Sequence, residues 1–179
     1  MVYQIRNGVK KTEEKKTLLE AKNLTKIYGK GDLAVKALDN INLEIKEGDF
    51  MVAIGPSGSG KTTLLNMFGA LDKPTEGEVF IGSVKISKIK ESKLNKIRRG
   101  KIGFIFQTYY LIPTLTVLQN ILIPVLPERK NEELIKRGKA LLAEVGLQGK
   151  EHRKPSQLSG GEQQRVAIAR ALILDPILI

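Results

Sequence analysis

The amino-acid sequence predicts an α/β fold with a mainly parallel sheet. The uninterrupted apolar run Phe50–Ile54 is typical of a strand buried on both faces, and it leads directly into a glycine-rich loop. Residues Thr62–Gly69, which follow this loop, have the apolar spacing of a helix. Further short apolar segments alternate with helical patterns, which is the arrangement of a sheet built from strand–helix–strand units.

Spacing and turn residues predict the other elements. Alternation at Ile41, Leu43 and Ile45 indicates a half-buried strand, and the same period at Ile102, Phe104 and Phe106 indicates a strand over 101–107. The remaining expected elements are strands at Glu78–Ile86 around a turn at Gly82 and at Pro176–Ile179, and helices from Ser92 to Gly100, over Thr116–Ile123, from Asn131 to Gly146, and from Ser159 to before Asp175.

Length and composition are those of one folded domain, which we expect at residues 17–179 behind a basic, flexible tail of residues 1–16. The 179 residues are 41% apolar and 27% charged, and they include no cysteine, which excludes disulfides and thiolate metal sites. The net charge of +11 could attract nucleic acid or anionic lipid. No aromatic residues are interleaved with the lysines, so a solvated basic face is preferred and no specific nucleic-acid partner is expected.

One short segment has the pattern of a phosphate-binding loop, namely Gly55-Pro56-Ser57-Gly58-Ser59-Gly60-Lys61-Thr62-Thr63. Glycines allow successive backbone N–H groups to point at phosphate oxygens, and the following helix directs its partly positive N-terminus at the same anion. Lys61 should neutralise the β- and γ-phosphates, and Thr62 should offer its hydroxyl to Mg²⁺. The loop therefore predicts a bound nucleoside triphosphate, although by itself it fits many kinds of NTPase.

A second segment, Leu158–Arg165, has the sequence LSGGEQQR. Ser159 and Glu162 have the spacing of a capping box at a helix start. A cap does not need Gly160 and Gly161, because glycine is a poor helix former. Two bare glycine amides, a serine hydroxyl and a helix N-terminus together indicate a second site for an anion.

Together these motifs resemble the nucleotide-binding domain of ATP-binding cassette (ABC) transporters. The Walker A loop at Gly55–Thr62, the Q-loop glutamine at Gln107 and the signature at Leu158–Arg165 stand in the family order, and the resemblance covers residues 18–179. It implies a P-loop NTPase (RecA-like) core, an antiparallel β-subdomain and an α-helical subdomain at residues 108–157, with the C-terminal strands missing.

The resemblance also implies roles for individual residues. ATP would bind with its adenine on Tyr28 and its phosphates on residues 55–63, and Lys61 and Gln107 would be catalytic. Mg²⁺ would be held by Thr62 and Gln107. The signature residues would act in trans on ATP bound to a second nucleotide-binding subunit, which makes a homodimer the expected assembly; these residues are Ser159, Gly160, Gly161, Glu162 and Gln163.

A finer match concerns the segments Leu71–Glu78, Phe104–Gln107 and Leu111–Thr116. They resemble the subgroup that serves lipoprotein-release and macrolide-export systems. This implies a cytoplasmic ATPase subunit, peripheral on the inner face of the cell membrane, that couples ATP binding and hydrolysis to transport or extraction by a transmembrane permease. The segment after Gln107 would receive the coupling helix of that permease.

The sequence also departs from the family. Family members continue past the position of Ile179 into an Asp-Glu pair, which includes the general base, and later a switch histidine, whereas the only histidine here, His152, precedes the signature and is expected to be an exposed loop residue. We therefore expect a truncated cassette that binds ATP weakly, hydrolyses none and is marginally stable. Two alternatives stay open: a soluble ABC-type ATPase acting on DNA or ribosomes, and a regulatory nucleotide-binding module that never hydrolyses.

Overall fold

The computed structural model describes residues 2–6, 15–125 and 132–179. The chain divides into two compact units at the junction of Leu94 and Asn95, and each unit has its own buried apolar residues. The predicted helical subdomain, residues 108–157, lies in the second unit. None of the described helices is long and apolar enough to cross a membrane.

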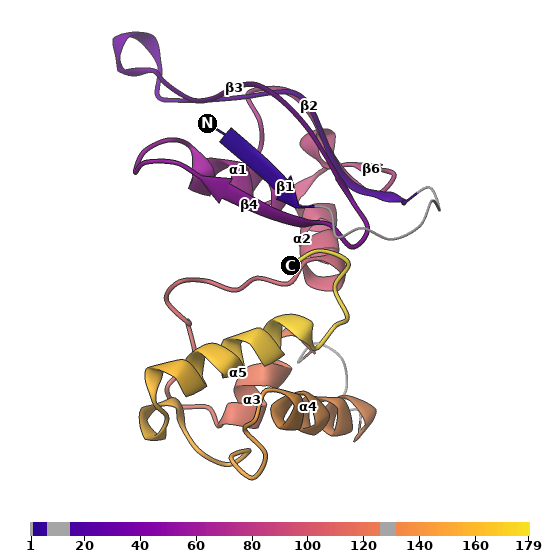
Figure 1. Cartoon of the computed structure of the whole chain (residues 1–179), viewed down its shortest axis with the longest axis vertical. Helices are drawn as coiled ribbons and strands as arrows, with labels where there is room; N and C mark the ends of the chain where they lie inside the picture. The colour runs from indigo at the N-terminus through magenta and orange to yellow at the C-terminus, as the bar shows by residue number, and fades with distance from the viewer. Residues whose placement is uncertain (1, 7–14, 126–131) are drawn as a thin grey trace. The chain divides into compact units, whose positions relative to one another are not determined.

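The first unit contains an antiparallel sheet of four strands in the order β3-β2-β5-β6 (Figure 1). Leu19, Val79 and Ile81 are fully buried on one face of this sheet, as the alternating pattern of its strands requires. The strand expected at positions 41–45 and the hairpin expected at Gly82 are thereby confirmed. The strands are β2 (Thr17–Tyr28), β3 (Val35–Lys46), β5 (Glu76–Ile81) and β6 (Val84–Lys85).

Strand β4 (Phe50–Ile54) leads into the glycine-rich loop and helix α1 (Lys61–Phe68), as predicted. Leu64 and Met67 of α1 are fully buried, and the helix contacts β3 and β5. The expectation that β4 is buried on both faces is wrong, because Phe50 is 70% exposed. Among the described residues β4 pairs only with the antiparallel strand β1 (Val2–Arg6), and a two-stranded ribbon cannot cover both of its faces. Strand β1 lies in the segment that the sequence predicts to be a tail.

The described residues do not form the expected mainly parallel sheet. Their parallel pairing is the single bridge between Ile102 and Leu178, with a 2.8 Å hydrogen bond from the N–H of Gly103 to the carbonyl of Leu178. The strands expected over 101–107 and 176–179 are therefore not formed, and these segments are joined by this bridge and by hydrogen bonds from the N–H groups of Ile177 and Leu178 to the carbonyl of Lys101. Parallel ladders form where several strands are covered on both faces, and β4 has an antiparallel partner instead.

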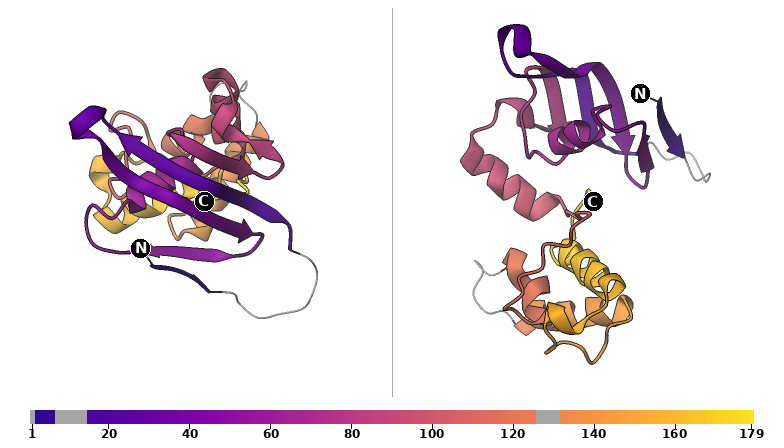
Figure 2. Two further views of the ribbon diagram at one scale, coloured as in Figure 1. Left: turned by 90° about the horizontal axis from the view of Figure 1, so that it is seen from above. Right: turned by 90° about the vertical axis from the view of Figure 1, so that its left-hand side faces the viewer.

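In the part of the second unit that the structure describes, three helices contact one another around one apolar core (Figure 2). They are α3 (Val117–Leu122), α4 (Glu132–Glu144) and α5 (Gly160–Leu172), and the start expected for the second at Asn131 lies outside the described residues. The core residues are Val117, Ile121, Val125, Leu141, Leu142, Leu147, Leu158, Val166, Ala169 and Ile173.

The remaining elements are short or connect the units in sequence. Helix α2 (Glu91–Lys101) runs across the junction of the two units. The sequence predicts Ser92 as its N-cap, but Ser92 lies inside the first turn of the helix. The amides of Lys93 and Leu94 donate to the carbonyl of Lys90, which places the start of the helix earlier. The 3₁₀ turns are η1 (Gly31–Leu33), η2 (Ile86–Lys88), η3 (Ile123–Val125) and η4 (Pro155–Gln157).

Asn120 of α3 is fully buried and holds the segment that leads into this helix. Its Oδ1 accepts a 2.7 Å hydrogen bond from the N–H of Ile112, and its Nδ2 donates to the carbonyls of Ile112, Leu115 and Thr116. Thr116 in turn caps the helix with Gln119 in a capping box. One buried amide thus bonds four backbone groups of the segment 112–116, and for the N–H of Ile112 and the carbonyl of Leu115 it supplies the hydrogen bond that the structure shows.

Replacing Asn120 by alanine should lower the free energy of unfolding by about 1–3 kcal/mol, because the part-buried hydrogen bonds to the N–H of Ile112 and the carbonyl of Leu115 are lost. Urea denaturation followed by circular dichroism measures this effect. Gln148→Ala, at an exposed position of the same unit, is the control and should leave the denaturation midpoint unchanged. Equal midpoints for the two variants would contradict the role of Asn120.

Candidate functional site

The glycine-rich loop between β4 and α1 is folded around the ammonium group of Lys61. This group donates to the carbonyl oxygens of Gly55 at 2.9 Å and Pro56 at 2.6 Å, and it lies 3.3 Å from the hydroxyl of Ser59. The amide of Ser59 closes the turn by donating to the carbonyl of Pro56. The charge of Lys61 therefore stands inside the loop, where the phosphates of a nucleotide are expected.

The geometry of this loop explains its glycines. Gly58 and Gly60 have φ of 78° and 86°, which side-chain-bearing residues rarely adopt. A Cβ on Gly55 would lie only 2.7 Å from the hydroxyl oxygen of Ser59, so a side chain there would require Ser59 to shift. The left-handed Gly60 is also the N-cap of α1 and turns the chain into the helix. A loop of bare backbone before a helix N-terminus fits a phosphate group.

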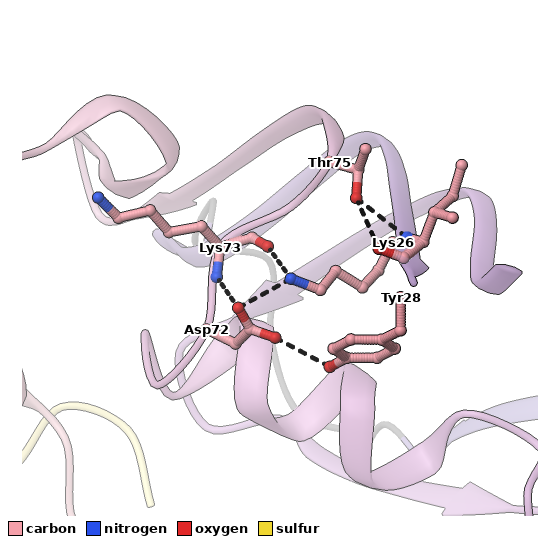
Figure 3. A network of polar contacts seen from close by, with 6 residues as sticks. Lys26, Tyr28, Asp72, Lys73 and Thr75 are labelled. Atoms are coloured by element: carbon pink, nitrogen blue, oxygen red, sulfur yellow. Dashed lines mark hydrogen bonds and ion pairs between the residues drawn. The ribbon is translucent and has the colours of Figure 1, made fainter. Parts of the chain in front are cut away.

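Tyr28 lies in the same unit as this loop, at the end of β2, and its side chain is 41% exposed. Its hydroxyl donates a 2.9 Å hydrogen bond to Asp72 (Figure 3). Burial raises the pKa of Tyr28, the bond to Asp72 adds to this rise, and hydrogen bonding with Thr63, the last residue of the loop motif, opposes it. The structure thus brings the predicted adenine-binding aromatic next to the predicted phosphate loop.

The signature segment has the capping geometry that the sequence predicts. Ser159 is the N-cap of α5, its hydroxyl accepts from the N–H of Glu162, and its own N–H donates to the Glu162 carboxylate at 2.7 Å. Gly160 and Gly161 are exposed at this helix start. The side-chain amide of Gln163 donates to the carbonyls of Pro155 and Leu158, so this residue ties the helix to the preceding turn.

Glu162 is held in its charged form. The ammonium of Lys150 forms an ion pair with its carboxylate, and the backbone and hydroxyl of Ser159 add further hydrogen bonds. Together these contacts lower the pKa of Glu162 from an ordinary value of 4.5 to about 2. The cap of α5 is therefore maintained by a charge network as well as by hydrogen bonds.

Gln107 is exposed, and the segment after it is fastened to the signature helix. Arg170 of α5 donates to the carbonyls of Tyr109 at 2.6 Å and Tyr110 at 2.7 Å, while its burial lowers its pKa. The hydroxyl of Tyr109 lies 3.5 Å from the position that a Cβ on Gly160 would take. Within the second unit, the structure therefore brings the segment after the predicted Q-loop glutamine to the predicted signature.

Arg170 and Asp72, which hold other residues of the candidate site in place, were not identified from the sequence, although a signal existed for Arg170. This arginine lies on a helix whose neighbouring positions Val166, Ala167 and Ala169 are fully buried, and a cation among such positions needs acceptors. Asp72 gave no local signal for its contact with Tyr28. His152 is exposed, as predicted. The roles of Thr62 and Gln107 toward Mg²⁺ stay predictions, because these residues belong to different units.

The pKa of Glu162 leads to a pH-dependent difference between the native chain and Glu162→Gln. Because the pKa of Glu162 is lower in the folded chain than in the unfolded chain, its charge stabilises the folded chain fully above about pH 4.5. This stabilisation is lost as the pH falls toward 2. The thermal midpoint of the native chain should therefore exceed that of the variant at pH 6, and this gap should shrink between pH 4.5 and 2. Glu144→Gln, at an exposed position of α4, is the control. A gap that does not change with pH would refute this charge network.

Comparison with known proteins agrees with this geometry. A family model described as ABC transporter matches residues 38–179. An uncharacterized ABC transporter ATP-binding protein of Methanocaldococcus jannaschii is 49% identical over 90% of the chain and 71% of its own length. The lipoprotein-releasing system ATP-binding protein LolD of Aquifex aeolicus is 48% identical over 90% of the chain and 71% of its own length. The macrolide export ATP-binding/permease protein MacB of Escherichia coli is 45% identical over 88% of the chain and 25% of its own length.

Solved structures show the same similarity in three dimensions. The dimeric post-hydrolysis state of the ATP-binding cassette MJ0796, bound to ADP and Pi, matches with a TM-score of 0.78 at 51% identity. The match covers 88% of this chain and 70% of that chain. The resemblance to an ABC cassette, to its P-loop fold class and to the lipoprotein-release and macrolide-export subgroup is thus confirmed. The chain belongs to the ATP-binding cassette family of ABC transporters.

Proposed function

We propose that the chain is the ATP-binding subunit of a transporter and couples ATP binding and hydrolysis to transport or extraction by a membrane permease. The observation that carries this proposal is the phosphate loop folded around the Lys61 ammonium, with Tyr28 beside it. A loop of this kind provides charge and bare N–H groups for phosphates, and the aromatic ring provides a surface for a base. The names of the relatives support the link to a permease.

In this proposal each loop residue contributes to binding. The Lys61 ammonium exchanges its contacts with the carbonyls of Gly55 and Pro56 for oxygens of the β- and γ-phosphates. Backbone N–H groups of residues 57–63 and the N-terminus of α1 hold the same anion, and Tyr28 stacks on the adenine. Thr62 and Gln107 are the residues proposed to hold Mg²⁺, which neutralises charge on the phosphates when it is bound.

The signature is proposed to complete the site of a second copy of the chain. Ser159, Gly160 and Gly161 present a hydroxyl and exposed backbone at the start of α5, while Glu162 and Gln163 hold the cap in shape. The dimeric state of the solved cassettes supports a homodimer in which each signature contacts ATP bound to the other copy. Two anion sites, one in each unit of the chain, suit such an exchange.

The proposed permease partner places the protein on the cytoplasmic face of a membrane. The segment after Gln107, which Arg170 and Asn120 hold, is the proposed contact for the permease. No specific nucleic-acid partner is proposed.

No residue between Glu162 and Ile179 is proposed as the general base of hydrolysis. After Glu162 the sequence has one side-chain carboxylate, that of Asp175. Its side chain is 91% exposed and lies 3.5 Å from the guanidinium of Arg137. A general base has to reach the attacking water, and this solvated carboxylate has none of the surroundings that prepare a base for that task.

Replacing Lys61 by alanine should weaken ATP binding about 10- to 100-fold, because hydrogen bonds from a charged group to the phosphates are lost. Calorimetry with ATP and Mg²⁺ measures the dissociation constant. Lys36→Ala is the matched control, since Lys36 is an exposed lysine whose ion pair is with Asp39. Equal affinities of the Lys61→Ala variant and the native chain would reject the proposed phosphate site.

ATP should also promote a dimer of the chain, which size-exclusion chromatography with light scattering can detect. Lys61→Ala and Gly161→Glu should each abolish the ATP-dependent dimer of the pure variant, since one removes phosphate binding and the other places a charge at the signature. An equimolar mixture should regain part of it, because the mixed dimer keeps one intact composite site. A dimer that forms equally well without ATP, or a mixture with no recovery, would contradict action in trans.

A further inference from the structure

Three side chains of the first unit form a cluster that fixes the ring of Tyr28 (Figure 3). The Tyr28 hydroxyl donates to one carboxylate oxygen of Asp72 at 2.9 Å, and the other oxygen accepts from the ammonium of Lys26 at 2.8 Å. The same ammonium lies 4.8 Å from the centre of the Tyr28 ring. The ring is therefore held at its hydroxyl end and is covered by a cation on one face.

Asp72 is itself fixed by the backbone around it. Its N–H donates to the carbonyl of Asn66 in α1 at 3.3 Å, and its carboxylate accepts from the N–H of Lys73 at 2.7 Å. Thr75 accepts a 3.0 Å hydrogen bond from the N–H of Ile27, the neighbour of Tyr28. Residues 71–75 thus join the helix that follows the phosphate loop to the strand that carries Tyr28.

The charges of this cluster suit a fixed arrangement. The side chain of Lys26 is only 12% exposed and that of Asp72 is 33% exposed. Partial burial opposes ionisation of Asp72, but hydrogen bonds from Lys26 and Tyr28 keep its pKa below the ordinary value. The Tyr28 hydroxyl, whose pKa is raised, remains a donor to a charged carboxylate, and such bonds are stronger than neutral ones.

We infer that Asp72 and Lys26 are positioning residues that hold the Tyr28 ring as a platform for the base of the nucleotide. This inference rests on the proposed function, in which Tyr28 stacks on adenine. Because Lys26 covers one face of the ring, the opposite face is the one left for the base. A ring already held at its hydroxyl loses little side-chain freedom when the base binds, and this increases affinity. Asp72 belongs to the segment Leu71–Glu78, which resembles the lipoprotein-release subgroup. In this inference the segment supports base binding by holding the Tyr28 ring through Asp72.

The experiment compares the dissociation constants of Mg²⁺-ATP and Mg²⁺-tripolyphosphate for each variant of the full chain. Their ratio measures the contribution of the nucleoside separately from that of the phosphate loop. Tyr28→Ala should remove most of the advantage in affinity that Mg²⁺-ATP has over Mg²⁺-tripolyphosphate. Tyr28→Phe and Asp72→Ala should each lower it about 3- to 10-fold, as expected for a lost hydrogen bond to a charged group. The variant that combines Tyr28→Phe with Asp72→Ala should lower the ratio no further than the stronger of the two single changes, because both changes remove the same contact.

Two further variants serve as controls. Asp72→Asn keeps an acceptor for the Tyr28 hydroxyl and should retain more of the ratio than Asp72→Ala. Asp39→Ala removes an aspartate whose 3.2 Å ion pair with Lys36 is exposed, and it should leave the ratio unchanged.

The outcomes separate this inference from the proposed function. If Tyr28→Ala leaves the ratio unchanged, Tyr28 does not bind the base, and that part of the proposed function fails together with the inference. If Tyr28→Ala abolishes the ratio while Tyr28→Phe and Asp72→Ala preserve it, base stacking stands and the positioning role is overturned. A parallel loss of tripolyphosphate affinity in Asp72→Ala would likewise overturn it, because the effect would then act through the phosphate loop.

Discussion

The contact between the Lys61 ammonium and the carbonyl oxygens of Gly55 and Pro56 is the interaction on which the candidate nucleotide site depends. It places a positive charge inside a loop whose backbone is otherwise bare. The left-handed conformation of Gly58 and Gly60 allows this curvature, and the start of α1 supplies a partial positive charge at the same point. In the proposed function a triphosphate would replace carbonyl oxygens that already lie at hydrogen-bonding distance from the ammonium, so the loop would need little rearrangement to accept it.

The two candidate anion sites are supported in a similar way. In the first unit, the segment after α1 returns to β2 and fixes Tyr28 through Asp72. In the second unit, Arg170 of the signature helix fixes the segment after Gln107 through two backbone carbonyls. In both cases a charged side chain distant in sequence holds a neighbouring segment of the chain beside a helix that begins at a candidate anion site. Rigid support of this kind keeps functional groups on loops in place.

The parts of the molecule that were predicted correctly are those governed by local rules. The capping box at Ser159, the short helix that begins after Thr116, the helix after the phosphate loop and the hairpin at Gly82 each depend on a few consecutive residues. Their hydrogen bonds close within one turn, so spacing alone is sufficient to identify them. The phosphate loop belongs to the same class, because its conformation is set by its own glycines and by the lysine that follows them.

The errors concern pairings that the local sequence does not encode. The apolar run at Phe50–Ile54 specifies a strand but not its neighbours, and with β1 as its partner the strand leaves Phe50 and Ile54 exposed. Likewise, alternation at Ile102 and Phe104 is compatible with a ladder, yet only one parallel bridge forms among the residues described. The contact of Tyr28 with Asp72 spans 44 positions, and no period or cap relates the two residues. Such contacts are selected by the packing of whole elements, because the free energy of a single ion pair or hydrogen bond is too small to choose a strand neighbour by itself.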